Sequence, residues 1–255
     1  QLVQSADVVL EADEPYPPLE AQDVCQAWCP TPRALGTFRE RGLPEPPGPA
    51  LEVLREVNSR AFSAKLGQWL PGAALLHDMD ALRERVAQPS PTGWWLVKRA
   101  FGFAGRGRRR IPPTGPTPDD LTFCKRSLQE GHGVQVEPWV ERLQDHSIHA
   151  WLFPDGTFEE GPVLLQRYDS WGSWQGSEVA PPETLGVEEK RCLRDAMHRA
   201  VHALHGRGYH GPLGIDGYRY LGADGGQAYN PLSDLNARFT MGYMGPQPFR
   251  DKPPA

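Results

Sequence analysis

A lysine at the end of an apolar run, followed by glycines and arginines, is the first group of residues that could do chemistry. The segment 94–98 reads Trp-Trp-Leu-Val-Lys, and the segment 101–110 contains Gly102, Gly105, Gly107 and the arginines at 106 and 108–110. Glycines let backbone N–H groups come close to phosphate oxygens, and Lys98 adds a positive charge for the same oxygens. The two segments predict an anion site, although a solvated basic hairpin has the same composition. They are not a P-loop, because no Gly-Lys-Ser/Thr follows the glycines.

Two aspartates and an asparagine farther along the chain could hold a divalent cation. Asp234 and Asn236 are two residues apart, so in a strand they point to the same face, and Asp216 lies on the preceding expected strand. Carboxylate and amide oxygens are the hard ligands that magnesium takes, together with water and phosphate. Without a metal, the same residues would cap turns or lie in solvent.

The turn between these two strands decides whether the three side chains meet. A two-residue turn at 224–225 sets Asp216 opposite Ser233 and puts Asp216 and Asp234 on opposite faces. A three-residue turn, or a bulge near Pro231, brings all three to one face. The sequence does not decide between these two arrangements. The metal hypothesis requires the one with a three-residue turn or a bulge.

A third feature is the segment 136–140, which reads Val-Glu-Pro-Trp-Val and is followed by Asp145. A strand that leaves a sheet offers backbone N–H and C=O groups to an adenine edge, and a nearby acid accepts hydrogen bonds from ribose hydroxyls. An ordinary structural strand has the same pattern, so this segment acquires a meaning only beside the other two features.

Strands and a few helices must position these residues. Strands are expected at 8–10, 94–98, 134–140, 147–153, 158–166, 213–220 and 227–236, and Pro138 confines its strand to an edge or to its terminus. Apolar spacing predicts helices over 51–70 and 187–206, the second with a stripe of Leu193, Met197, Val201 and Leu204. The segments 101–110 and 167–182 are expected to be loops. This mixture predicts an α+β fold.

Composition limits the class of protein. The chain has 255 residues, of which 39% are hydrophobic, and a formal net charge of −5. It can therefore build a core, as one large domain or two small ones, and disorder of the whole chain is excluded. No stretch reaches the roughly 18 apolar residues of a membrane-spanning helix, so no membrane partner is expected. The mild acidity argues against nucleic-acid binding, and four sparse cysteines favour reduced thiols in a cytoplasmic protein.

Taken in chain order, these features resemble the ATP-grasp superfamily over roughly residues 57–244. The most specific part is the segment 233–238, Ser-Asp-Leu-Asn-Ala-Arg, which looks like the family's acid-x-Asn-x-Arg segment. The run 208–216 looks like the glycine-bracketed strand that carries the first metal acid, and the segment 97–107 looks like the lysine strand and its phosphate loop.

Two positions depart from the family's pattern. Many members have Glu where this chain has Asp234, and members that ligate amino acids often have Arg at the position of Gly214. These departures keep a catalytically silent module among the alternatives.

The resemblance implies a fold and a domain organisation. Two α+β subdomains would grip ATP between them, a small lid subdomain over residues 57–140 and a C-terminal metal-binding subdomain over residues 141–250. The proline-rich residues 1–56 would form a short or truncated N-terminal region.

The resemblance also implies residues that bind ATP through its phosphates, adenine or ribose. They are Arg60, Lys98, Gly105, Gly107, Glu137, Val140 and Asp145. Lys98 and the two glycines would contact the phosphates. Arg60 would be the earlier basic residue that also reaches phosphate, and Lys65 is the alternative candidate for that role. Glu137 and Val140 belong to the adenine hinge, and Asp145 belongs to the ribose.

The remaining implied roles concern the metal and the reaction. Magnesium would be held by Asp216, Asp234 and Asn236. Arg238 would act with Lys98 as a catalytic residue and would stabilise negative charge on the transferred phosphoryl group or on a tetrahedral intermediate.

The implied activity is that of an ATP- and magnesium-dependent ligase, which joins a carboxylate to an amine or thiol through an acylphosphate and releases ADP. A small-molecule kinase and a catalytically silent nucleotide-binding module are the alternatives. The partners would be small-molecule or peptide substrates, and a homodimer is a possible assembly. Arg167 is a candidate binder of a substrate carboxylate, with a plain surface or dimer-contact loop as the other interpretation of its segment.

Overall fold

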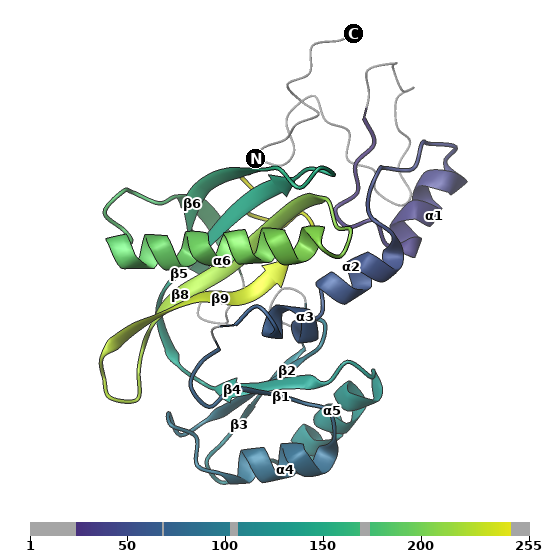
Figure 1. Cartoon of the computed structure of the whole chain (residues 1–255). Helices are drawn as coiled ribbons and strands as arrows, with labels where there is room; N and C mark the ends of the chain where they lie inside the picture. Colours follow the sequence, from purple (N-terminus) through teal and green to yellow (C-terminus); the bar gives the residue numbers. More distant parts are fainter. Residues whose placement is uncertain (1–23, 68, 103–106, 169–173, 246–255) are drawn as a thin grey trace.

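The fold contains two antiparallel sheets, one above the other in Figure 1, with helices packed on them. The computed structural model describes residues 24–67, 69–102, 107–168 and 174–245. Among these residues, three helices precede the first described strand: α1 (Pro32–Glu40), α2 (Leu51–Val57) and α3 (Arg60–Ala64). Within the described ranges, none of the helices combines the length and the apolar character needed to cross a membrane.

The smaller sheet brings Lys98 to its inner face. Its strand order is β1-β4-β2-β3, with β1 (Ala74–Leu76), β2 (Trp95–Arg99), β3 (Arg108–Ile111) and β4 (Val134–Pro138). Helices α4 (Met79–Ala87) and α5 (Pro118–Gln129) cover the outer face, where Trp95 and Val97 enter the apolar core. Because side chains alternate along a strand, Leu96 and Lys98 point the other way, toward the larger sheet.

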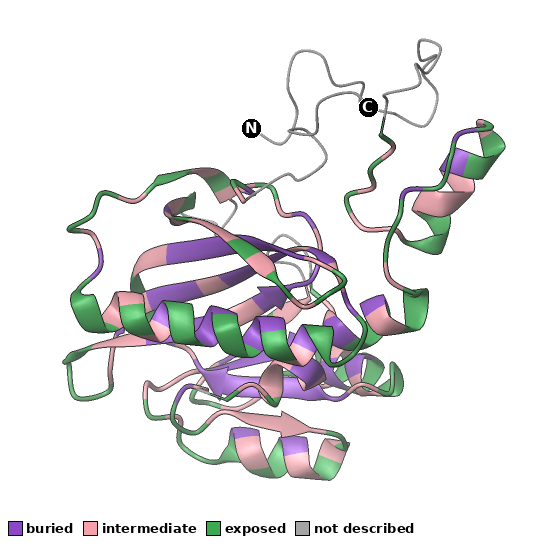
Figure 2. Ribbon diagram, turned by 45° about the horizontal axis from the view of Figure 1, so that its top comes forward, coloured by how far each residue is buried: buried purple, intermediate pink, exposed green. Residues whose placement is uncertain are grey.

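The larger sheet has the order β7-β6-β5-β8-β9. Its strands are β5 (Glu141–Leu152), β6 (Phe158–Tyr168), β7 (Trp174–Val179), β8 (Gly211–Leu221) and β9 (Gln227–Asn236). The long helix α6 (Val187–His205) packs on one face through the apolar stripe at 193, 197, 201 and 204, which is buried against Ile148 and Ile215. Figure 2 shows the resulting alternation of buried and exposed bands along α6. The opposite face is left for polar side chains.

The β8–β9 hairpin combines the two features that bring the metal candidates together. Gly222 N donates to Gly226 O (2.8 Å) across a three-residue turn. The register then shifts beside Pro231, so that Asp216 pairs directly with Asp234. Asp216 and Asp234 therefore share one face of the sheet with Asn236, which lies two residues after Asp234 on β9.

Most of the elements expected from the sequence are present. The predicted α+β class is confirmed, as are the helix over 187–206 and the strands that correspond to β2, β4, β5, β6, β8 and β9. Pro138 is the last residue of β4, which agrees with its predicted position at a strand terminus. The strand expected at 8–10 lies outside the described residues.

Three expectations are wrong. The single helix over 51–70 is broken, because Ser59 Oγ accepts a hydrogen bond from Phe62 N (3.2 Å) and begins α3 as a separate helix. The expected loop 167–182 contains β7, which pairs with β6. The expected loop 101–110 contains the start of β3, because residues 108–111 pair with β2.

Candidate functional site

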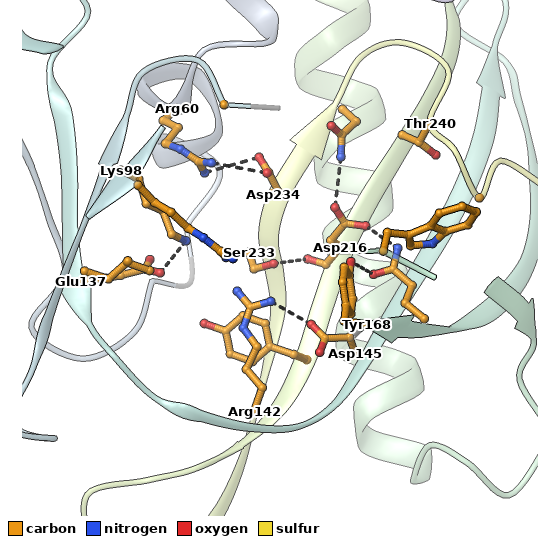
Figure 3. A pocket seen from close by; sticks show the side chains of 18 of the residues that line it. Arg60, Lys98, Glu137, Arg142, Asp145, Tyr168, Asp216, Ser233, Asp234 and Thr240 are labelled. Atoms are coloured by element: carbon orange, nitrogen blue, oxygen red, sulfur yellow. Dashed lines mark hydrogen bonds and ion pairs between the residues drawn. The ribbon is translucent and has the colours of Figure 1, made fainter. Parts of the chain in front are cut away.

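A cavity of about 340 Å³ lies between the two sheets, and most of the predicted site residues line it (Figure 3). The charged residues that line it are Arg60, Lys98, Arg108, Glu137, Arg142, Asp145, Asp216, Asp234 and Arg238. They come from α3, from both sheets and from the segment after β9. The site therefore exists only where the sheets face each other.

Lys98 is held by a buried ion pair. Its Nζ lies 2.5 Å from Oε1 of Glu137, and the two side chains are only 7% and 5% exposed. Gln135 Nε2 donates to the second carboxylate oxygen of Glu137 (2.8 Å). Burial lowers the pKa of Lys98, the nearby Arg60 and Arg142 lower it further, and Glu137 opposes them. The pair fixes the ammonium group in the cavity, where it can meet an anion.

Asp216 is surrounded by hydrogen-bond donors from neighbouring strands. Its carboxylate accepts from Gln166 Nε2 (3.0 Å) and from Asn236 Nδ2 (3.1 Å), and Ser233 Oγ donates to its backbone oxygen (3.1 Å). Burial and the negative charge of Asp234 raise the pKa of Asp216 to about 7. The two aspartates thus form a pair of like charges that lacks a full counter-charge.

Arg60 faces the second aspartate and connects the two sheets. Its Nη1 and Nη2 lie 3.4 Å and 3.5 Å from the carboxylate oxygens of Asp234 on β9. Its Nε donates to the backbone oxygen of Arg99, the last residue of β2 (3.0 Å). Of the two competitors for the early phosphate-binding residue, Arg60 lines the cavity, and Lys65 is not among the lining residues.

The three oxygen-bearing side chains fit magnesium better than they fit a metal that needs a full set of protein ligands. Asp216, Asp234 and Asn236 offer two carboxylates and an amide on one face. The described part of the chain contains no group of three or more His, Cys, Asp or Glu side chains arranged for a metal ion. Magnesium commonly takes one or two carboxylates and completes its shell with water and phosphate. The raised pKa of Asp216 indicates where an additional positive charge would be stabilised.

Arg238 stands at the end of this acidic face. Its Nη2 donates to Oδ1 of Asn236 (2.7 Å), and its Nη1 donates to the backbone oxygen of Phe239 (3.2 Å). These contacts orient the guanidinium beside the metal candidates, where it can stabilise negative charge.

Arg108, one of the arginines of the expected anion site, enters the cavity from β3. Two other lining residues are absent from the sequence predictions. The first is Arg142, which pairs with Asp145 (2.8 Å) and lies 4.0 Å over the ring of Tyr218. Burial raises the pKa of Asp145, and the charge of Arg142 opposes this effect. Gln166 was also missed, although strand alternation on β6 would have offered it as the alternative to Arg167.

Other predicted residues have different surroundings. Arg167 does not line the cavity, because it points away from the face that carries Gln166 and pairs with Glu178 at the surface (2.5 Å). Val140 lines the cavity two residues after the end of β4. Gly107 has a φ of 78° and its oxygen accepts from Arg99 N (2.9 Å), which begins the pairing of β3 with β2. Gly105 lies outside the described residues.

Gly214 has a structural reason to be glycine. It lies opposite His149 on β5, and a Cβ at this position would overlap Cδ2 of the His149 ring and lie 3.0 Å from its Nε2. Nε2 of His149 shares a hydrogen bond with Thr240 Oγ1 (2.9 Å), which holds the ring in place. The imidazole therefore occupies the space that a side chain at 214 would need.

Comparisons with known proteins identify the fold. No protein-family model matches the sequence, and no curated protein sequence matches it. The structure is similar to biotin carboxylase from Campylobacter jejuni in a β-γ-ATP complex, with a TM-score of 0.58, 12% identity, and coverage of 86% of this chain and 48% of the other. The chain has the ATP-grasp fold.

Two further ATP-grasp structures give the same result. Carboxyaminoimidazole ribonucleotide synthase from Aspergillus clavatus, complexed with ATP, matches with a TM-score of 0.52 and 15% identity over 82% of this chain and 51% of that chain. N5-carboxyaminoimidazole ribonucleotide synthetase from Thermus thermophilus matches with a TM-score of 0.52 and 20% identity over 84% and 54%. The chain thus spans about half the length of the structures that it matches.

A double-mutant cycle tests whether Lys98 and Glu137 form a buried ion pair. Lys98→Met or Glu137→Leu alone leaves one buried charge without its partner, and each is expected to lower the free energy of unfolding by about 3 kcal/mol. The double variant should recover most of this loss, because it buries no charge. Urea unfolding measures all four proteins.

The exposed Arg191–Glu188 pair on α6 is the matched control. Its coupling energy should stay below about 1 kcal/mol, because solvent screens exposed charges. If the losses of unfolding free energy in the two single variants simply add in the double variant, the Lys98–Glu137 ion pair is contradicted.

His149 generates a pH prediction. Burial lowers the pKa of His149 to about 4 from its usual 6.5, so the unfolded chain takes up the proton first. The neutral ring therefore stabilises the fold fully above pH 6.5, and this contribution is lost as the pH falls toward 4. His149→Gln keeps a hydrogen-bonding side chain and should reduce the acid-induced loss of unfolding free energy by about 3 kcal/mol. His202→Gln, on the exposed side of α6, leaves the buried His149 in place and is the control, so this variant should retain the acid-induced loss.

Proposed function

We propose that this chain binds ATP with magnesium between its two sheets and acts as an ADP-forming ligase that joins a carboxylate to an amine. One observation carries the proposal: Lys98 on the small sheet and the Asp216, Asp234 and Asn236 face of the large sheet line the same cavity. The structural neighbours add support. One of them, the biotin carboxylase domain of a 2-oxoglutarate carboxylase from Hydrogenobacter thermophilus, is in complex with MgADP and bicarbonate.

In this proposal the cations of the cavity bind the nucleotide phosphates. Lys98 meets the α- and β-phosphates together with the backbone around Gly105 and Gly107, and Arg60 reaches phosphate from α3. The segment from Glu137 to Val140 borders the adenine. The carboxylate of Glu137 is engaged with Lys98, so the backbone of this segment supplies the hydrogen bonds to the base.

Asp145 is assigned to the ribose, where it can accept hydroxyl hydrogen bonds while Arg142 keeps it oriented. Asp216, Asp234 and Asn236 would hold magnesium. When bound, magnesium supplies positive charge that neutralises the phosphate oxygens during transfer. The carboxyl group of Asp216 has to lose its proton for this role, and the adjacent cation favours that ionisation.

The reaction proceeds in two displacements. An oxygen of the substrate carboxylate attacks the γ-phosphorus, the bond between that phosphorus and the bridging oxygen breaks, and ADP leaves with the electron pair. The amine nitrogen then attacks the acyl carbon, inorganic phosphate leaves, and the excess proton of the amine passes to solvent. Arg238 stabilises the negative charge of both steps, and the surrounding residues position the reactants.

The test is release of ADP from ATP in the presence of magnesium and a panel of carboxylates and amines. Lys98→Ala and Asp216→Ala should lower turnover by about a hundredfold or more, because each removes a charge that binds the transferring phosphates. Asp234→Ala, at a side chain that is 40% exposed, should do the same with less risk to folding. Chelation of magnesium should abolish turnover in the native protein.

The exposed residues Lys125 and Asp80 supply matched controls, and their alanine variants should keep native turnover. Full turnover in the Lys98 and Asp216 variants would overturn the site assignment. A phosphorylated product without any amide would identify a kinase. A magnesium-dependent rise in Tm with ATP but no turnover would identify a silent nucleotide-binding module.

A further inference from the structure

A second cavity, of about 350 Å³, lies beside the first, and we call it the side cavity. Its walls are the segments 24–30 and 46–49, the end of β5 with Trp151 and Phe153, and the start of β8. Among the described residues that line it, Arg238 is the single Lys, Arg, Asp or Glu. The side cavity is thus mainly apolar, with Arg238 as its one guanidinium and with Gln26, Tyr209 and His210 as polar side chains on its wall.

The side cavity joins the nucleotide cavity at two residues. Trp28 and Arg238 line both of them. Phe239 N donates to Trp28 O (3.2 Å), so the segment that follows β9 is tied to the N-terminal wall. Because Arg238 also contacts Asn236 (2.7 Å), the cation at the junction is coupled to the candidate metal face.

We propose that the side cavity holds the apolar body of the carboxylic acid substrate, with its carboxylate at Arg238. This inference rests on the proposed function and specifies its substrate class. A guanidinium matches a carboxylate in charge and geometry. A mainly apolar lining favours a hydrocarbon or aromatic body, whereas a second carboxylate would lose its hydration and would find no second Lys or Arg among the described lining residues.

The size of the side cavity limits this acid. At roughly 30 Å³ for each water-sized group, the volume accommodates a body of about ten non-hydrogen atoms. A medium-chain fatty acid or an arylalkanoic acid fits this description.

Calorimetric titration of the full chain, without ATP, tests the inference directly. The probes are acetate, butyrate, hexanoate and 4-phenylbutyrate, with adipate as the dicarboxylate matched in length to hexanoate. Affinity should rise about fourfold with each methylene group that becomes buried. Adipate should bind about tenfold more weakly than hexanoate, or worse, because its second carboxylate enters the mainly apolar side cavity.

A larger side chain on the wall of the side cavity provides a variant for this test. Ala27 lines the side cavity but not the nucleotide cavity, so Ala27→Phe should weaken hexanoate binding about tenfold and leave MgADP binding unchanged. Ala223→Phe, in the exposed β8–β9 turn, is the matched control and should change neither.

The outcomes separate this inference from the proposed function. Equal affinity for hexanoate and adipate, absence of acid binding, or full hexanoate affinity in Ala27→Phe would each overturn the side-cavity assignment. Release of ADP that is stimulated only by small polar acids would uphold the ligase and overturn the apolar substrate class. Tight, Ala27-sensitive binding of hexanoate without any ADP release would uphold the side cavity as a binding site and overturn the ligase.

Discussion

The carboxylates of Asp216 and Asp234 stand directly opposite each other on neighbouring strands, and their repulsion has to be balanced for the two sheets to meet as they do. Donors from three elements supply the balance: Gln166 from β6, Asn236 from β9 and Arg60 from α3. Arg60 belongs to neither sheet, yet it also holds the end of β2 through the Arg99 carbonyl. Arg60 therefore links the like-charged pair of the large sheet to the end of β2, the strand of the small sheet that carries Lys98.

Positive and negative side chains gather at particular places in this chain, and the net charge does not show this. A net charge of −5 hides a cavity in which Arg60, Lys98, Arg108 and Arg142 gather within reach of the aspartate pair. Burial lowers the pKa of Lys98 and of Arg108, and it raises the pKa of Asp216, so burial makes the charged forms of both kinds of group costly. A ligand that brings anionic oxygens and a divalent cation together would relieve both costs at once. This is the physical basis of the proposed binding of a magnesium–nucleotide complex.

The sequence was informative wherever alternation or helical spacing decides the outcome. The apolar strand that carries Lys98, the stripe of α6 and the strand that carries Asp216 all follow from local periodicity. The β8–β9 register did not follow, because it depends on a turn length and on an irregularity at Pro231 that only the packed sheet selects. The partners of the site residues were also beyond the sequence: Glu137 meets Lys98, and Gln166 meets Asp216, through contacts between strands. On β6 a change of one position separates Arg167, which lies at the surface, from Gln166, which lines the site.

The prolines of the N-terminal region acquire a meaning from the wall that they build. Pro30, Pro46, Pro47 and Pro49 line the side cavity, and each ring fixes its own φ near −65°. A wall with so few accessible backbone states has little conformational entropy left to lose when a ligand enters. The shape of the chamber is therefore set before binding, and selectivity there comes from a preorganised surface and not from a segment that orders around its guest.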